Sequence, residues 1–162
     1  MQRLILFRHG KAAASSDSGD DFDRPLAPRG VGEASEMGAR LAGLGVRPDV
    51  ALVSMAARTR QTWEAAQAAF PAATVKFDPS LYNAASSEIW RAAGEEPGAV
   101  MVVAHNPGLH ELALRLMIAA SAPAQDLAAA QSRFPPATAA VFAFGADGAP
   151  RFEGLHYPQR PE

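Results

Sequence analysis

Four residues of this sequence, two arginines and two histidines, have the side chains needed for chemistry on a bound anion. They are Arg8, His9, Arg58 and His105. Guanidinium groups match phosphate oxygens in shape and stay charged at physiological pH, so two of them aimed at one pocket indicate an anionic ligand, with phosphate favoured over carboxylate. A neutral histidine beside them can attack phosphorus near pH 7, while the arginines spread the charge on the phosphoryl oxygens.

Each of these residues comes at or shortly after the end of a predicted strand. The apolar stretches Leu4–Phe7, Asp49–Val53 and Ala99–Ala104 have the pattern of buried strands. Ligands of parallel α/β sheets sit beyond the carboxyl ends of the strands. If the three strands are parallel neighbours, the two arginines and the two histidines therefore meet at one edge of the sheet.

The turns at this edge have residues suited to an anion site. Gly10 follows His9, and a residue without Cβ lets the backbone turn sharply and come close to a ligand. The turn His105–Gly108 opens a predicted helix, whose N-terminal amides add donors for the same anion. Taken singly, however, an arginine or histidine at the end of a strand is usually a solvated terminus.

The remaining pattern predicts strands alternating with helices over most of the chain. The first predicted helix starts near Pro28. Further helices are predicted over Arg58–Phe70, Ser86–Ala93 (with Ser86 or Ser87 as N-cap), Pro107–Ala119 and an ill-defined part of Ala120–Pro136. A weaker strand is predicted over Thr74–Phe77, a terminal hairpin over Ala139–Phe144 and Arg151–Leu155, and a loop over Lys11–Arg24. This order predicts one domain, a three-layer α/β/α sandwich around a mostly parallel sheet.

Composition narrows the class of protein. The chain has 162 residues, a net charge of −2 and no cysteine, so disulfides and thiolate chemistry are excluded. The charge balance gives no support to nucleic-acid binding. Neither a signal peptide nor a membrane span is expected, since Arg8 interrupts the first apolar run after Phe7. A cytoplasmic protein is therefore expected.

Other residues with chemical potential have simpler interpretations. Arg60 fits a solvent-facing helical position, and His110 and His156 fit structural or surface roles. The acidic run Asp20–Asp23 lacks a partner cluster with ligand spacing, so a solvated or capping role is expected instead of a metal site. A serine hydrolase is disfavoured because the G-x-S-x-G elbow is missing, and Gly43-Leu44-Gly45 lacks the third glycine of a dinucleotide loop.

Several motifs together resemble the histidine phosphatase superfamily, also called phosphoglycerate mutase-like. They are R-H-G at 8–10, S-x-x-x-R-x-x-Q-T at 54–62 and A-H-N-P-G at 104–108. The short length and the stretches 21–30, 80–84 and 105–112 are similar to the SixA-like branch, which contains phosphohistidine phosphatases. The resemblance covers nearly the whole chain and implies a single histidine phosphatase domain over residues 1–162.

The resemblance also implies roles for the five residues. His9 would be the nucleophile that becomes phosphohistidine, Arg8 and Arg58 would hold the phosphoryl group, and His105 would donate to a phosphoryl oxygen. Gly10 would shape the loop and belong to the phosphate-binding set. Water would then release the phosphate. The resemblance implies no metal and no cofactor, a phosphorylated substrate, and a histidine-phosphotransfer protein as a candidate partner.

One departure from the family pattern bears on the substrate. Larger members carry a glutamate acid where this chain has Asn83, and an amide cannot donate a proton as an acid does. An imidazole leaving group needs a strong acid less than an alkoxide does, so the change favours phosphohistidine. Asp21, Asp23, Glu88 and His105 are alternative proton donors, and Lys11 could add positive charge at the mouth of the pocket. A phosphomonoesterase and a non-catalytic phosphate-binding module on the same fold are the alternatives.

Overall fold

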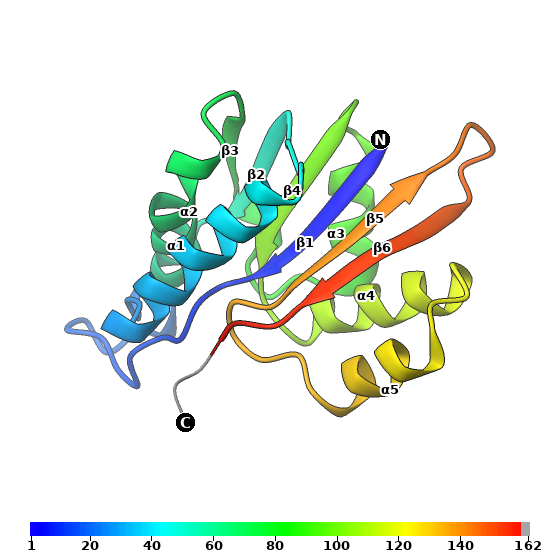
Figure 1. Ribbon diagram of the computed structural model, residues 1–162. Helices are drawn as coiled ribbons and strands as arrows, with labels where there is room; N and C mark the ends of the chain where they lie inside the picture. The colour runs from blue at the N-terminus through cyan, green and yellow to red at the C-terminus, as the bar shows by residue number, and fades with distance from the viewer. Residues whose placement is uncertain (160–162) are drawn as a thin grey trace.

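The computed structural model describes residues 1–159, which form a central sheet between two layers of helices (Figure 1). The strands are β1 (Arg3–Arg8), β2 (Val50–Ser54), β3 (Thr74–Asp78), β4 (Ala99–Ala104), β5 (Ala139–Phe144) and β6 (Pro150–His156). The α-helices are α1 (Pro28–Gly43), α2 (Ala57–Ala66), α3 (Ser86–Gly94), α4 (Gly108–Ala119) and α5 (Ala124–Ser132), and short 3₁₀ turns cover Asp21–Asp23, Gln67–Ala69 and Pro79–Leu81.

The sheet has the strand order β3-β2-β4-β1-β5-β6. Strands β3, β2, β4 and β1 are parallel, whereas β5 and β6 are antiparallel additions that form the terminal hairpin. The predicted α/β fold with a mostly parallel sheet is therefore confirmed.

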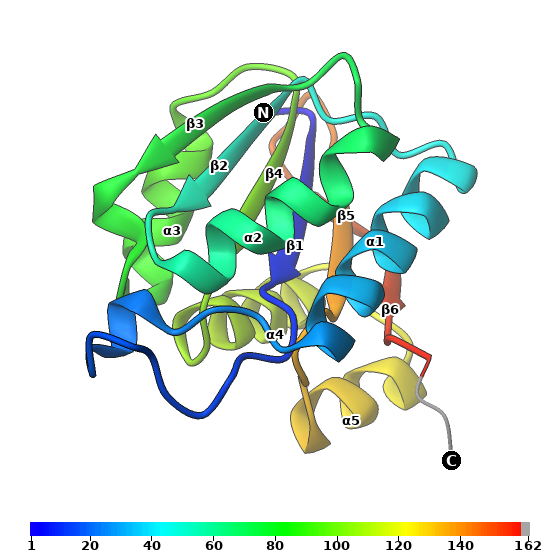
Figure 2. The ribbon, with the colours of Figure 1, turned by 90° about the vertical axis from the view of Figure 1, so that its left-hand side faces the viewer.

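Helices cover the sheet on both faces, with α1 and α2 on one side and α3, α4 and α5 on the other (Figures 1 and 2). Alternating side chains of β1 enter the two layers: Leu4 and Leu6 pack with α3 and α4, while Ile5 and Phe7 pack with α1 and α2. Because both faces are covered, β4 is apolar along its whole length, as parallel strands commonly are.

The register of the central strands aligns the residues that follow them. Arg8 of β1 is paired with Ala104 of β4, and Val53 of β2 is paired with Val103 of β4. The carboxyl ends of three adjacent parallel strands therefore lie level at one edge. The loop between β1 and α1 crosses this same edge, below the sheet in Figure 2.

Two details of the helices differ from the sequence prediction. The expected N-cap serine of α3 is wrong: Ala85 is the N-cap, and the Glu88 carboxylate accepts from its N–H at 3.1 Å, so the cap amide is satisfied without a hydroxyl. The helix predicted to reach Phe70 ends at Ala66 and continues only as a 3₁₀ turn before Pro71.

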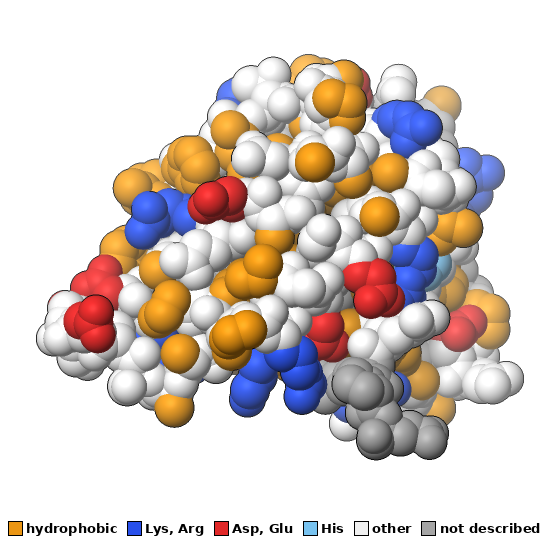
Figure 3. Space-filling view, turned by 60° about the vertical axis from the view of Figure 1, so that its left-hand side comes forward, with side chains coloured by type: hydrophobic (Ala, Val, Ile, Leu, Met, Phe, Trp, Pro, Cys, Tyr) orange, Lys and Arg blue, Asp and Glu red, His pale blue; other side chains and the backbone are white. Residues whose placement is uncertain are grey.

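Figure 3 shows a face of the molecule on which Lys and Arg side chains are interspersed with Asp and Glu, not gathered in one field. No helix within residues 1–159 is long and apolar enough to cross a membrane.

Candidate active site

The arginines and histidines singled out in the sequence meet at the carboxyl edge of β1, β2 and β4. The rings of His9 and His105 lie 5.3 Å apart, centroid to centroid. Both histidines and Arg58 are only 7% exposed. Charged and polar residues are seldom buried to this extent. These three side chains are therefore not the solvated strand ends that the sequence left as an alternative.

The hydrogen bond of His9 determines which of its ring nitrogens carries the proton. Its Nδ1 lies 2.7 Å from the carbonyl oxygen of Gly10. A carbonyl can only accept, so Nδ1 carries the proton and Nε2 keeps its lone pair. Burial lowers the pKa of His9 from 6.5 to about 4, with Arg8 and Arg58 adding to the effect and the Gly10 bond opposing it. His9 is therefore neutral at pH 7, with an unprotonated Nε2.

Gly10 and Gly30 let the backbone after β1 pack against the start of α1. A Cβ at Gly10 would lie 2.6 Å from the carbonyl oxygen of Gly30, and one at Gly30 would lie 2.2 Å from that of Lys11. The Gly10 N–H donates to Thr62 Oγ1 at 2.9 Å, and the Thr62 hydroxyl donates to the carbonyl of Arg58 at 2.7 Å. This chain of bonds ties the loop of His9 to the helix that carries Arg58.

His105 is held by Ser54, the last residue of β2. The Nε2 of His105 lies 2.7 Å from Ser54 Oγ, and Ser54 is fully buried. The other ring nitrogen, Nδ1, is buried and has no hydrogen-bond partner within the described residues. Burial lowers the pKa of His105 to about 3, with the charges of His9 and Arg58 contributing. His105 is thus a neutral imidazole with one nitrogen open to a ligand.

Arg8 is anchored on the other side of the site. Its Nη1 donates to the carbonyl of Phe134 at 2.9 Å, and the Asn106 side-chain amide donates to the same oxygen at 3.0 Å. The segment before β5 therefore fixes both the first arginine and the turn that follows His105.

The acidic run contributes Asp21 to the site as a partner of Arg58. Arg58 donates from Nη1 to the main-chain carbonyl of Asp21 at 2.9 Å and from Nη2 to Asp21 Oδ2 at 3.1 Å. Tyr82 and Arg24 also donate to the carboxylate, at 2.7 and 2.8 Å. These bonds, that of Tyr82 first, hold the pKa of Asp21 well below its usual range. The expectation that this run is merely solvated or capping is therefore wrong for Asp21.

Other residues named from the sequence have different surroundings. Arg60 is exposed and donates to the carbonyl of Met55, and His110 bonds the carbonyl of Ala130 and stacks on Phe134, which is a structural role. Asn83 and Lys11 are exposed.

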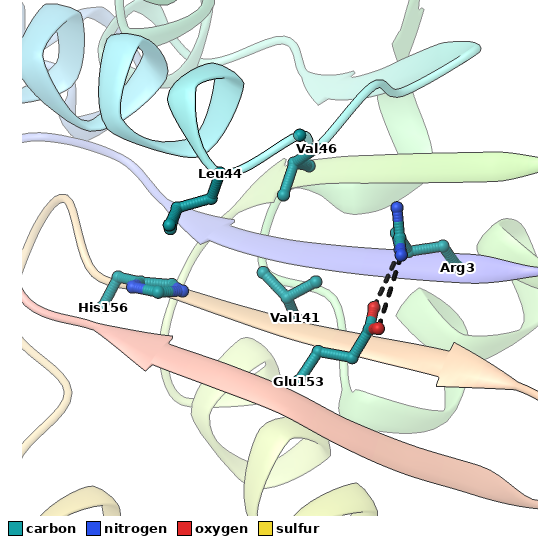
Figure 4. Close-up of a pocket in the computed structure, with 7 residues that line it drawn as sticks. Arg3, Leu44, Val46, Val141, Glu153 and His156 are labelled. Atoms are coloured by element: carbon teal, nitrogen blue, oxygen red, sulfur yellow. Dashed lines mark hydrogen bonds and ion pairs between the residues drawn. The ribbon is translucent and has the colours of Figure 1, made fainter.

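His156 lines a separate cavity of about 260 Å³ beside the end of α1. In Figure 4 it faces this cavity opposite the ion pair of Arg3 with Glu153, with Leu44, Val46 and Val141 between them. None of the candidate site residues lines this cavity.

The site can bind an anion through fixed positive charge. Arg8 and Arg58 supply the charge, and the N-terminus of α4 begins three residues after His105. Residues 1–159 contain no group of three or more His, Asp or Glu side chains arranged to hold a metal ion. Ser54, Thr62, Tyr82 and Asp21 also belong to the site. The sequence assigned no role to Ser54, Thr62 or Tyr82, and it suggested Asp21 only as a proton donor. Their positions in the stretches S-x-x-x-R-x-x-Q-T at 54–62, D-x-x-R-P at 21–25 and S-L-Y-N-A at 80–84 were the available signal.

Comparison with known proteins agrees with this geometry. The family model described as histidine phosphatase superfamily (branch 1) matches residues 4–88. An uncharacterized chloroplast protein of Arabidopsis thaliana is 32% identical over 170 residues, covering 97% of this chain and 78% of the relative. An uncharacterized protein of Mycobacterium tuberculosis is 37% identical over 141 residues, covering 83% of this chain and 84% of its own.

Solved structures extend the likeness over nearly the full length. A structure from Agrobacterium tumefaciens, assigned as the phosphohistidine phosphatase SixA, is 34% identical with a TM-score of 0.82, covering 97% of this chain and 98% of that one. The protein histidine phosphatase SixA complexed with tungstate shares the fold, at 22% identity, a TM-score of 0.72, and coverage of 94% and 95%. The chain therefore belongs to the histidine phosphatase superfamily and, within it, to the SixA-like branch.

Proposed function

We propose that this protein, as one histidine phosphatase domain over residues 1–162, is a metal-independent phosphatase that acts on phosphohistidine through a covalent intermediate on His9. The observation that carries the proposal is the Nδ1–H of His9 held on the Gly10 carbonyl, which leaves Nε2 free to act as a nucleophile in the field of two nearby arginines, Arg8 and Arg58. The SixA-like relatives support the same activity.

In the first step, the lone pair of His9 Nε2 forms a bond to phosphorus while the bond from phosphorus to the leaving group breaks. Arg8 and Arg58 bind the phosphoryl oxygens and neutralise the charge that builds up on them, as a metal ion does in other phosphoryl-transfer sites. His9 keeps its Nδ1 proton on Gly10 throughout, so the ring is held in line for attack.

In the second step, water attacks the phosphorus of phosphohistidine. The P–N bond breaks and its electron pair returns to His9 Nε2. One proton of the water stays on the phosphate product as its hydroxyl, and the other passes to solvent, which makes good the proton that the leaving imidazole took up in the first step. His105 Nδ1 lies open for a bond to a phosphoryl oxygen. Donation from Nδ1 requires that Ser54 donate to Nε2, or that the bound dianion raise the pKa of His105 until both nitrogens carry protons.

The leaving group separates phosphohistidine from ordinary esters. Asn83 cannot act as an acid, and the Asp21 carboxyl is ionised because three donors stabilise its anion. An imidazole leaves readily with a proton from solvent, whereas an alkoxide needs an acid. A phosphohistidine side chain on a histidine-phosphotransfer protein is accordingly the proposed substrate. Phosphomonoesters are the second candidate, with protonated His105 as the acid.

The covalent intermediate gives the direct test. We expect mass spectrometry of the protein, quenched after mixing with phosphoramidate, to find acid-labile phosphate on His9. His9→Asn should abolish labelling and turnover, while His156→Asn, which removes a histidine outside the site, should leave both unchanged. Equal turnover by wild type and His9→Asn would refute the mechanism.

Substrate comparison tests the second half of the proposal. A phosphohistidine peptide should be hydrolysed with a higher kcat/KM than an aryl phosphate that has a comparable charge. A clear preference for the ester would replace phosphohistidine by phosphomonoesters. Oxyanion binding without turnover of either substrate would indicate the non-catalytic module.

A further inference from the structure

Asp21 makes an unusual double contact with the arginine at the centre of the site. Both its main-chain carbonyl and its carboxylate accept hydrogen bonds from the guanidinium of Arg58, at 2.9 and 3.1 Å. Arg58 is 7% exposed and lies on α2, whereas Asp21 comes from the loop between β1 and α1. A loop residue therefore holds a nearly buried side chain from both ends of its terminal fork.

The two bonds use only one edge of the guanidinium. Arginine has an end-on edge formed by Nη1 and Nη2 and a side-on edge formed by Nε and Nη2, and each can bind two oxygens of a phosphate. Asp21 occupies the end-on edge. Within the described residues no hydrogen bond or ion pair takes the Nε–H of Arg58. The side-on edge is thus the one left for a phosphoryl group.

The carboxylate of Asp21 is itself held in place. Tyr82 donates to the same Oδ2 that binds Arg58, and Arg24 donates to Oδ1. The Tyr82 ring in turn packs edge-on against both Phe22 and His105, with centroids 5.1 and 5.6 Å apart. Asp21 therefore has little freedom to leave Arg58, although the residue is exposed.

We infer that Asp21 is a positioning residue of the phosphoryl site, which fixes the end-on edge of Arg58 so that the side-on edge is presented to the phosphoryl group. The inference rests on the proposed function, because it assigns Asp21 a part in phosphoryl binding. Arginine has a long flexible side chain, and ordering it on ligand binding costs conformational entropy. If Asp21 already holds the guanidinium of Arg58, less of this entropy is lost and the phosphoryl group binds more tightly.

A competing interpretation of the Asp21–Arg58 contact predicts the opposite effect of removing Asp21 on anion affinity. If the Asp21 carboxylate instead occupied the place of the phosphoryl group, an anion would have to displace it, and removal of the carboxylate would tighten anion binding. The positioning role predicts weaker binding on removal. The sign of one measurement therefore decides between the two.

The probe for this measurement is tungstate, titrated into the full-length protein by calorimetry. We expect Asp21→Ala to weaken tungstate binding at least fivefold, and Asp21→Asn to stay within about twofold of wild type because its amide oxygen can still accept from Arg58. The matched control is Asp23→Ala, which removes one carboxylate from the same turn. Asp23 accepts a hydrogen bond from the Ser18 hydroxyl and has none with Arg58. Unchanged or tighter binding by Asp21→Ala would overturn the inference.

A double-mutant cycle shows whether the effect passes through Arg58. In an Arg58→Ala background, Asp21→Ala should change tungstate affinity by less than twofold, whereas independent effects would add. Thermal melting of every variant reports whether it is folded. A full additional loss in the Arg58→Ala background would assign Asp21 a general structural role and contradict the inference.

Kinetics separate this inference from the proposed function. With phosphoramidate as substrate, Asp21→Ala should lower kcat about tenfold or more, since small displacements of a catalytic group have large effects on rate, and Asp21→Asn should recover most of the loss. If the wild type binds tungstate but hydrolyses no substrate, the proposed function fails, while the tungstate affinities of the variants still test the positioning role of Asp21. If wild type is active and Asp21→Ala matches Asp23→Ala in both assays, only the inference fails.

Discussion

Acidification should destabilise this protein through the two buried histidines of the candidate active site, His9 and His105. The pKa of His9 falls from 6.5 to about 4 on folding, and that of His105 falls to about 3. Between these folded values and 6.5 the unfolded chain binds more protons than the folded protein. The stability that both histidines contribute is therefore complete above pH 6.5 and declines as the pH falls toward 4.

The magnitude follows from the two pKa values. Between about pH 7.5 and about pH 5, each histidine should cost about 2 kcal/mol of unfolding free energy, because the unfolded imidazole becomes protonated while the folded one stays neutral. Together they account for about 4 kcal/mol, a large share of the total stability of about 5–15 kcal/mol that is typical of a domain.

Urea unfolding at the two pH values, in a buffer free of phosphate, measures this loss. The comparison protein is the double variant His9→Asn, His105→Asn, in which neither position titrates. His156, whose pKa is also lowered by burial, is present in both proteins, so its contribution cancels. The wild type should lose about 4 kcal/mol more than the double variant. Equal losses would refute the assignment of two neutral buried histidines.

Two further predictions concern the supports of His105. Gly108→Ala should destabilise the fold by about 1–3 kcal/mol, because the added Cβ would clash with the Ala84 carbonyl oxygen. The control in thermal melting is Gly43→Ala, which is also helical but has open space around the added Cβ. Equal stability of the two variants would contradict the clash. Ser54→Ala should lower kcat about tenfold with little change in KM, because the His105 ring would lose the hydrogen bond that positions it for the proposed transition state. Ser87→Ala, at an exposed serine, should leave kcat unchanged. An unaltered kcat in Ser54→Ala would remove Ser54 from the site.

The sequence was sufficient to predict most of the framework because the central strands β1, β2 and β4 are short and strongly apolar. The end of β4 is an example: Ala99–Ala104 is apolar throughout and stops at His105, as the structure has it. The convergence of Arg8, Arg58 and His105 followed from one topological assumption, that β1, β4 and β2 are parallel neighbours. That assumption holds.

The contacts of Asp21 could not be predicted in the same way. Its partners Arg58 and Tyr82 are 37 and 61 residues away in sequence, and they meet it only because the loop after β1 folds back over the sheet edge. No periodic pattern encodes the path of such a loop. The same holds for Ser54, whose position at a strand end was visible but whose partner His105 lies on another strand.

The two arginines and the burial of the site act on the histidines in the same direction, and this explains why the arrangement suits a histidine nucleophile. Desolvation and the nearby cations disfavour the imidazolium form of His9, so its Nε2 keeps the lone pair that the proposed attack requires. In the proposed reaction, the charge of a bound phosphoryl dianion would offset that of the two arginines and raise the pKa of His105. His105 Nδ1 could then donate to a phosphoryl oxygen while His9 carries the phosphoryl group. The same fixed cations would thus favour a neutral His9 before the substrate binds and permit a protonated His105 afterwards.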